Sequence, residues 1–261
     1  MNTLNSNKSK REIMGLFLIF LFLVIILILT KEFNIIDKKE PVSTVPKLET
    51  KLPEPATKNE TIKTPVIDKK PIETAVSLLE KVYLDVPFQV QAPNANWDPV
   101  HEEACEEASL LMVYHFIKKI RITDGDIEIN NILDYEKTNK YGPSITLNAL
   151  SDIASSYYKL NYGTVHINIS IVDIKNELAN GNPVIVGAAG KILPNPNFRD
   201  GGPIYHMLVI KGYDKDGFIT NDPGTRLGNN FRYNYDDLFN SIHDWNSANI
   251  LNGGKNYLVF D

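Results

Sequence analysis

The chain has 261 residues, of which 43% are hydrophobic and 23% charged, and its formal net charge is −5. A phosphate-binding surface needs clustered lysines and arginines, so this composition argues against a nucleic-acid partner. The single cysteine, Cys105, excludes an internal disulfide. A lone thiol can instead act as a nucleophile, and its partners decide whether the chain is an enzyme.

An apolar run without any charged residue occupies residues 13–30. About 17–25 apolar residues are enough to cross a bilayer as a helix, so the run predicts one membrane span. Basic residues are more frequent in residues 1–12 than directly after the run, which favours a cytoplasmic N-terminal tail and an extracytoplasmic remainder. We therefore expect a single-pass protein of the cell membrane. A cleavable signal peptide is the competing interpretation, although no small-x-small cleavage site follows the run.

Residues 31–71 are rich in Pro, Lys, Thr and Glu and contain almost no aromatic side chain. Such a segment cannot bury enough apolar surface to offset the entropy lost on ordering, and it predicts a flexible linker. Residues 72–261 are numerous enough for one domain with a hydrophobic core. We expect a short helix at 74–81 and a short strand at 83–88 at its start.

Residues 102–120 predict a buried helix, because apolar side chains surround its axis instead of forming one stripe. Its start carries four glutamates and is the end expected to meet solvent. Cys105 would lie near this N-terminus, where the helix dipole favours a thiolate. Glu106 and Glu107 follow directly, and carboxylates close to the sulfur would oppose the dipole by raising the pKa of the thiol.

The remaining elements change from helical to strand periodicity along the chain. Asp-Gly at 216–217 is a strong hairpin signal between the last two predicted strands. Helices first and antiparallel strands later indicate an α+β fold. The pattern predicts a helix at 146–160 capped by Thr146, a strand at 164–169, a helix at 171–179, and strands at 183–188, 205–213 and 217–221.

A thiol hydrolase needs a base, a group that orients the base and donors for the oxyanion. Among the five histidines, His206 differs because it opens a strongly apolar strand directly after a Gly-Gly-Pro loop. Counting outward from the hairpin turn places Asp222 near opposite His206, where a carboxylate could fix the useful tautomer. Gln91 precedes the buried helix and could donate to an oxyanion. The loop at 193–203 is a candidate substrate-contacting lid.

Two metal motifs are incomplete in this sequence. The stretch from His101 to Cys105 imitates H-E-x-x-H, but cysteine replaces the second histidine and no third ligand is evident. Residues 212–223 imitate an EF-hand loop that lacks both end ligands, and a hairpin turn explains them better. We therefore expect neither a metal nor a cofactor.

Four sequence blocks stand out, at 86–91, 104–112, 206–214 and 221–224, and they contain Gln91, Cys105, His206 and Asp222 in this order. Taken together, they resemble the bacteriocin-processing, double-glycine-leader type of cysteine peptidase and its stand-alone relatives. The resemblance implies a papain-like fold with Cys105 as nucleophile, His206 as base and acid, Asp222 as its orienter and Gln91 as oxyanion donor. No G-x-x-x-x-G-K-[ST] phosphate loop is present, so we do not expect leader cleavage coupled to secretion.

The sequence thus predicts a membrane-anchored, extracytoplasmic cysteine peptidase that cleaves peptide or related amide bonds through a Cys-His-Asp triad. Its partners would be a peptide or protein substrate and the membrane. The alternative is a catalytically inactive peptidase-like module that binds ligands at the cell surface.

Overall fold

The structure is a computed structural model that describes residues 79–260. The predicted span at 13–30, the linker at 31–71 and most of the predicted helix at 74–81 lie outside the described residues. No helix in the described part combines the length and hydropathy needed to cross a bilayer.

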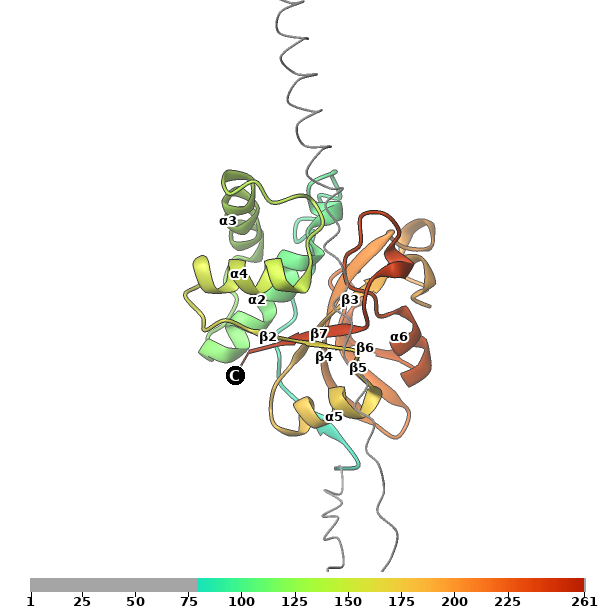
Figure 1. Ribbon diagram of the computed structural model, residues 1–261. Helices are drawn as coiled ribbons and strands as arrows, with labels where there is room; N and C mark the ends of the chain where they lie inside the picture. Colours follow the sequence, from blue (N-terminus) through green and yellow to red (C-terminus); the bar gives the residue numbers. More distant parts are fainter. Residues whose placement is uncertain (1–78, 261) are drawn as a thin grey trace, which may run out of the picture. The chain divides into compact units, whose positions relative to one another are not determined.

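The described residues form helices and strands in mixed order along the chain (Figure 1). The helices are α2 (Cys105–Lys118), α3 (Gly125–Thr138), α4 (Leu147–Ser156), α5 (Ile171–Ala179) and α6 (Tyr235–Ser241). The strands are β1 (Val82–Tyr83), β2 (Thr164–Ile167), β3 (Val184–Ala189), β4 (Tyr205–Asp214), β5 (Gly217–Asn221), β6 (Asn229–Tyr233) and β7 (Asn256–Val259). Short 3-10 helices are η1 (His101–Glu103), η2 (Gly190–Ile192), η3 (Arg199–Gly201) and η4 (Ile250–Asn252).

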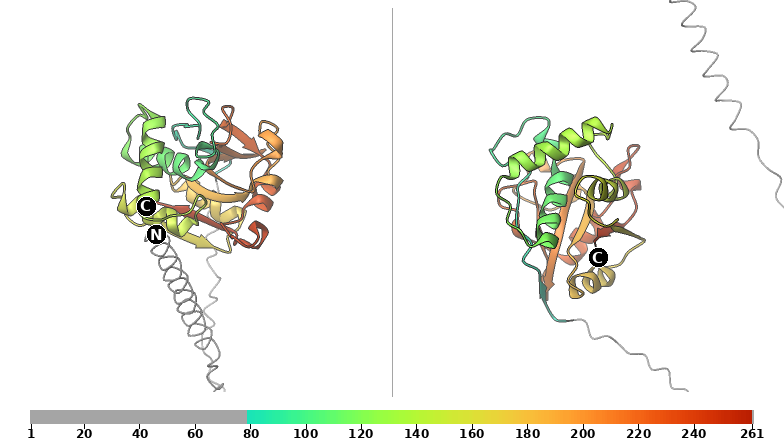
Figure 2. Two further views of the ribbon diagram at one scale, coloured as in Figure 1. Left: turned by 90° about the horizontal axis from the view of Figure 1, so that it is seen from above. Right: turned by 90° about the vertical axis from the view of Figure 1, so that its left-hand side faces the viewer.

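All strand pairs of the sheet are antiparallel, in the order β2-β7-β3-β4-β5-β6, and β1 also pairs with β4. Helices α2, α3 and α4 cover one face, and α5 and α6 cover the other, as the views of Figures 1 and 2 agree. The structure therefore has the expected α+β fold, with the helix that carries Cys105 packed on an antiparallel sheet.

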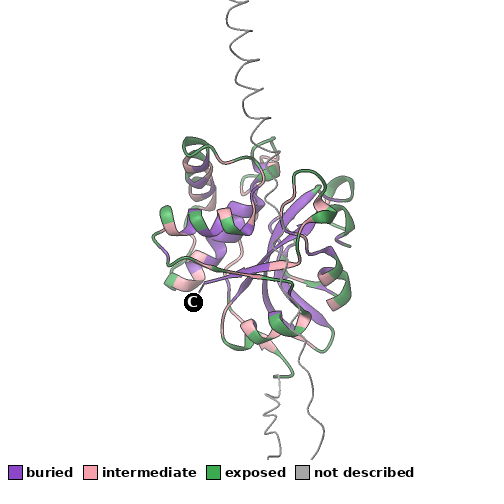
Figure 3. Ribbon diagram, viewed as in Figure 1, coloured by how far each residue is buried: buried purple, intermediate pink, exposed green. Residues whose placement is uncertain are grey.

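The central strand β4 is buried along almost all of its length (Figure 3). Because side chains alternate along a strand, Met207 and Val209 enter the core under α2, while Leu208 and Ile210 enter the core under α5 and α6. Two hydrophobic cores thus hold β4 in place from opposite sides. The backbone at the start of β4, which carries His206, is therefore held in a fixed position.

Local signals explain several element ends. The Thr146 hydroxyl accepts a hydrogen bond from Ala149 N at 3.2 Å, as predicted for a helix cap. Ser170 and Asp173 form a capping box that begins α5. The predicted hairpin between β4 and β5 is present, and Gly217 turns it with a φ of 150°.

Some elements differ from the sequence-based expectation. The predicted strand at 83–88 shrinks to Val82–Tyr83, because Pro87 has no N–H to continue a ladder and the chain turns toward the helix start. The helix predicted at 102–120 begins only at Cys105, since Ala104 has φ −91° and ψ 30°. The elements α3, α6, β6 and β7 were not predicted. A bulge between Ile210 and Gly212 shifts the register of β4 against β5.

Candidate active site

His206 and Asp222 form a buried pair at the start of β4. The imidazole Nε2 lies 2.8 Å from Asp222 Oδ1, and both side chains are almost completely buried. Val209 pairs with Asn221, so continuing this register places Asp222 diagonally across from His206, just past the end of β5. Diagonal neighbours on one face of an antiparallel pair stay within reach of long side chains. The structure therefore brings these two predicted site residues together.

The Asp222 carboxylate receives three further hydrogen bonds. Gly224 N donates to Oδ1 at 3.0 Å, whereas the Tyr233 hydroxyl and Asn195 Nδ2 donate to Oδ2 at 2.6 and 3.0 Å. Burial alone would raise the pKa of Asp222, but the adjacent His206 and these hydrogen bonds outweigh it and lower the pKa below its ordinary value. Asp222 is therefore an anion at neutral pH that can orient the imidazole.

The imidazole ring of His206 is also held by packing. Phe198 meets it edge to face, with ring centroids 5.2 Å apart. A Cβ placed on Gly224 would lie 2.9 Å from His206 Cε1, so this position needs glycine for a close approach. Since Nε2 is engaged by Asp222, Nδ1 is the ring nitrogen left for proton transfer. The ring borders a cavity of about 630 Å³.

The loop at 193–203 forms one wall of this cavity through Asn197, Phe198 and Arg199. Arg199 makes an ion pair with Glu102, a cavity residue at the helix start. The proposed contact of this loop with substrate stays a prediction, but its place beside His206 fits that role.

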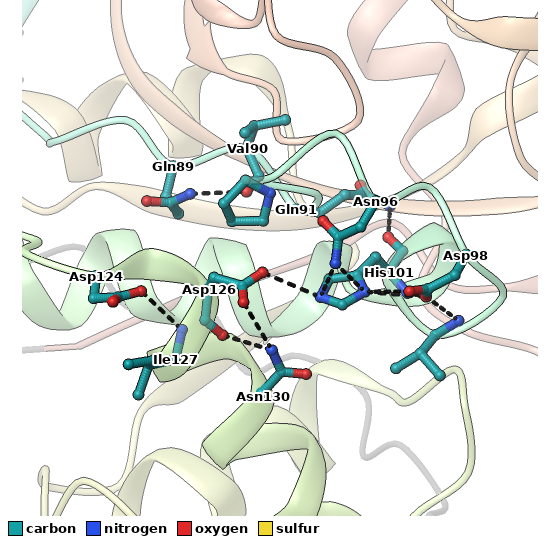
Figure 4. A network of polar contacts seen from close by, with 12 residues as sticks. Gln89, Val90, Gln91, Asn96, Asp98, His101, Asp124, Asp126, Ile127 and Asn130 are labelled. Atoms are coloured by element: carbon teal, nitrogen blue, oxygen red, sulfur yellow. Dashed lines mark hydrogen bonds and ion pairs between the residues drawn. The ribbon is translucent and has the colours of Figure 1, made fainter.

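Gln91 lines the same cavity and belongs to the segment before the helix. Figure 4 shows this residue beside the polar network at the helix start. Its backbone N–H donates to Pro223 O at 3.0 Å, which places it beside the Asp222 corner. Its side-chain Nε2 donates to the carbonyl oxygens of His101 and Glu102 at 2.8 and 2.9 Å. Both amide hydrogens are thus engaged, and donation to an oxyanion requires that one of them be shared.

His101 has a structural role in a polar network between the helix start and α3 (Figure 4). Its Nδ1 lies 3.0 Å from Asp98 Oδ1, and its Nε2 lies 3.6 Å from Asp126 Oδ1. Within residues 79–260, no group of three or more His, Cys, Asp and Glu side chains is arranged to hold a metal ion. The other histidines contact Glu128 (His115), Glu177 (His166) and Gly253 O (His243).

Cys105 is the first residue of α2 and is 4% exposed. Its Sγ donates a hydrogen bond to Glu106 Oε2 at 2.8 Å. The backbone N–H of Met207, the residue after His206, donates to the sulfur and lowers the pKa of the thiol. Burial, followed by the charge of Glu106, raises the pKa of the thiol well above its ordinary value. Among the described contacts, no hydrogen bond joins the sulfur to His206, so the structure brings Cys105 to the start of β4 without completing the predicted triad.

The sequence predicts that the four glutamates at the helix start meet solvent, and this holds at least partly for Glu102 and Glu103 but not for the other two. Glu106 and Glu107 are buried, and Glu106 Oε1 accepts a hydrogen bond from Ile145 N at 3.3 Å. Burial raises the pKa of Glu106 to about 8. Glu107 faces Glu136 of α3, and burial together with this second carboxyl raises the pKa of Glu107. The expectation fails because α3 covers this side of α2, and α3 was not predicted.

Three residues that surround the His206–Asp222 pair could not be identified from the sequence, namely Asn195, Phe198 and Tyr233. Asn195 and Phe198 belong to the predicted lid loop, but nothing in a loop sequence shows which side chains turn inward. Tyr233 lies in β6, whose alternation of Phe231 and Tyr233 was the signal that could have revealed a strand. Glu106 differs from these, because the sequence predicts that a carboxylate this close to the sulfur opposes the thiolate, and Glu106 does raise the pKa of the Cys105 thiol.

Comparisons with known proteins bear on the family and the fold of the chain. A model of the Peptidase_C39 like family matches residues 83–250. Among solved structures, a C39-like peptidase from Bacillus anthracis matches with a TM-score of 0.50 and 17% sequence identity, covering 70% of this chain and 98% of that chain. No curated protein matches the sequence. At this identity the structural likeness concerns the fold alone.

Proposed function

Because the chain belongs to the Peptidase_C39 like family, we propose that it is a cysteine peptidase that cleaves peptide or related amide bonds. In this proposal Cys105 is the nucleophile, His206 the base and acid, Asp222 the orienter and Gln91 a donor to the oxyanion. The observation that carries the proposal is the buried His206–Asp222 pair. The His206 imidazole borders the cavity, and the next residue, Met207, directs its backbone N–H to the Cys105 sulfur. The papain-like arrangement expected from the sequence fits these positions.

The reaction begins when the sulfur leaves Glu106 and gives its proton to Nδ1 of His206. The thiolate attacks the amide carbonyl carbon, the C–N bond breaks, and the amine departs with the proton returned by the imidazole. Water, deprotonated by His206, then hydrolyses the thioester, which releases the acid and restores the thiol. Asp222 holds Nε2–H throughout, so Nδ1 stays available for both proton transfers.

A digest of a broad peptide library with the full-length chain tests this function. Cleavage should require the thiol and the imidazole, so Cys105→Ala and His206→Ala should abolish product formation while circular dichroism still reports a folded domain. Hydrolysis that survives Cys105→Ala would exclude the proposed nucleophile. Processing of double-glycine leaders is a narrower prediction about the substrate, and peptides in which further residues follow Gly-Gly belong in the library.

A catalytically inactive binding module is the second candidate, and the environment of the thiol favours it. Cys105 is buried, is bound to Glu106 and has a raised pKa, as expected of an unreactive cysteine. Such a module would alkylate slowly at pH 6, and the rate would not depend on His206. A peptidase would alkylate with a pH midpoint below that of a free thiol, about 8.5, and would lose this property in His206→Ala.

We also propose that residues 13–30 anchor the chain in the cell membrane and that residues 31–71 tether the domain outside the cytoplasm. The uncharged apolar run and the basic residues before it support this orientation. Protease treatment of intact cells should remove the domain from the membrane fraction and leave a short N-terminal fragment. Recovery of a secreted chain that begins after residue 30 would instead indicate a cleaved signal peptide.

A further inference from the structure

The side of Asp222 that faces away from His206 is held by two buried side chains from separate segments. The Tyr233 hydroxyl of β6 donates to Oδ2 at 2.6 Å, and Asn195 Nδ2 donates to the same oxygen at 3.0 Å. Asn195 Nδ2 also donates to the Tyr233 hydroxyl at 3.0 Å, which closes a three-membered network. All three side chains are at least nine-tenths buried, so water does not compete for these bonds.

Asn195 also shapes the loop that packs against the imidazole. Its Oδ1 accepts hydrogen bonds from the backbone and side-chain nitrogens of Asn197 at 3.0 and 3.2 Å. Its backbone carbonyl accepts from Phe198 N at 3.2 Å, and Phe198 is the ring that meets His206 edge to face. One amide side chain therefore connects the cavity wall to the carboxylate behind the imidazole.

We propose that Asn195 and Tyr233 are positioning residues for the hydrolysis, keeping the Asp222 carboxylate fixed on His206 Nε2 so that Nδ1 serves as the base. The inference rests on the proposed function, since it assigns roles within the same site. A carboxylate held by one partner can rotate about its χ2 bond, whereas donors on both oxygens define a single orientation. An imidazole whose orienting group is lost adopts the wrong tautomer and loses catalysis.

Tyr233→Phe removes one donor without changing the shape of the side chain. Asn195→Asp keeps the Oδ1 acceptor for Asn197 but places a second charged oxygen against Asp222. Each variant should lower kcat roughly 10- to 100-fold, with little change in KM. This is the range seen when a residue that hydrogen-bonds to a metal ligand is removed, a comparable orienting role. Each variant also leaves fewer donors to stabilise the Asp222 carboxylate, so the pKa of Asp222 should rise. The acidic limb of the pH profile of kcat should therefore move to higher pH.

Two matched controls separate this effect from general damage. Tyr213→Phe removes a buried hydroxyl that has no hydrogen-bond partner in the described part of the chain. Asn249→Asp alters an exposed residue whose Oδ1 only caps Leu251 N, and aspartate serves equally well there. Both controls should keep kcat and the pH profile of the parent protein.

Proton NMR of the full-length chain in detergent gives a readout that does not need activity. The Nε2–H resonance of His206 should appear far downfield in the parent protein and should broaden or shift in Tyr233→Phe and Asn195→Asp. Unchanged kcat, pH profile and resonance in both variants would overturn the inference while leaving the peptidase proposal intact. A parent protein without hydrolysis, but with a resonance lost in Tyr233→Phe, would overturn the peptidase proposal and support the positioning. If Asn195→Asp does not fold, Tyr233→Phe alone decides.

Discussion

At the residue scale, Cys105 and Glu106 are neighbours in the chain and also contact each other through their side chains. The thiol donates to Glu106 Oε2 at 2.8 Å in a place that solvent barely reaches. Burial and then Glu106 raise the pKa of the thiol, whereas the Met207 N–H lowers it. Glu106 ionises near pH 8, and from there its charge opposes the thiolate, so the reactivity of Cys105 depends on Glu106 as well as on the helix dipole.

Glu106→Gln tests this dependence, because it removes the charge and keeps the shape. The amide oxygen can still accept from Ile145 N, and the amide nitrogen can donate to the sulfur. We expect the pKa of Cys105 to fall, which shifts the pH midpoint of iodoacetamide alkylation downward by roughly one unit. The exposed Glu80→Gln is the matched control and should leave the midpoint in place. An identical midpoint in Glu106→Gln would mean that burial alone governs the thiol.

At the element scale, the hairpin of β4 and β5 could be predicted because its signals are local. Asp-Gly marks the turn and strand periodicity marks both arms, so counting outward places Asp222 near His206. In a regular hairpin Asp222 would pair with Val209, which faces the other side of the sheet from His206, and a bulge in β4 moves its partner to Leu208, on the same face as His206. The bulge between Ile210 and Gly212 could not be predicted in this way. It lies where β4 pairs with β1 on one side and β5 on the other, so it depends on strands that are distant in the sequence.

The position of Cys105 at a helix start could also be predicted, but its surroundings could not. Helix periodicity shows which side chains are apolar, and it does not show what covers a polar helix end. Glu107 is buried because Glu136 of α3 packs against it, and Glu106 because Ile145 approaches from the segment before α4. Both covering segments come later in the chain, so the burial of these carboxyls is a tertiary effect.

Gly224 shows how the segment after β5 sets the geometry of the pair. A Cβ at this position would lie 2.9 Å from both His206 Cε1 and Phe198 Cε1. Gly224→Ala should therefore displace the imidazole and lower kcat by up to about 100-fold, because small misplacements of reacting groups have effects of this size. In the control Gly142→Ala, the nearest atom to the new Cβ is 3.6 Å away, and we expect parental kcat. Parental kcat in Gly224→Ala would show that the site tolerates a shifted ring.

At the scale of the whole domain, three buried carboxyls lie where α2 meets α3 and the segment before α4. Each of Glu106, Glu107 and Glu136 has a raised pKa, with burial as the first cause. A carboxyl with a raised pKa binds its proton more tightly in the folded chain than in the unfolded chain. Its contribution to stability is fully present below the unfolded value, near 4.5, and is lost as pH rises through the folded value, about 8 for Glu106.

The free energy of unfolding should therefore fall as pH rises from about 5 to about 8, by roughly 1.4 kcal/mol per pH unit for each extra proton that the folded chain holds. Glu107→Gln replaces the proton shared between α2 and α3 with an amide N–H that does not titrate, so the decline should become shallower. Urea unfolding at a series of pH values measures both slopes, and the exposed Glu80→Gln should reproduce the parental slope. A parental slope in Glu107→Gln would mean that the Glu107–Glu136 pair is already ionised in the folded core, so that Glu107 holds no extra proton there.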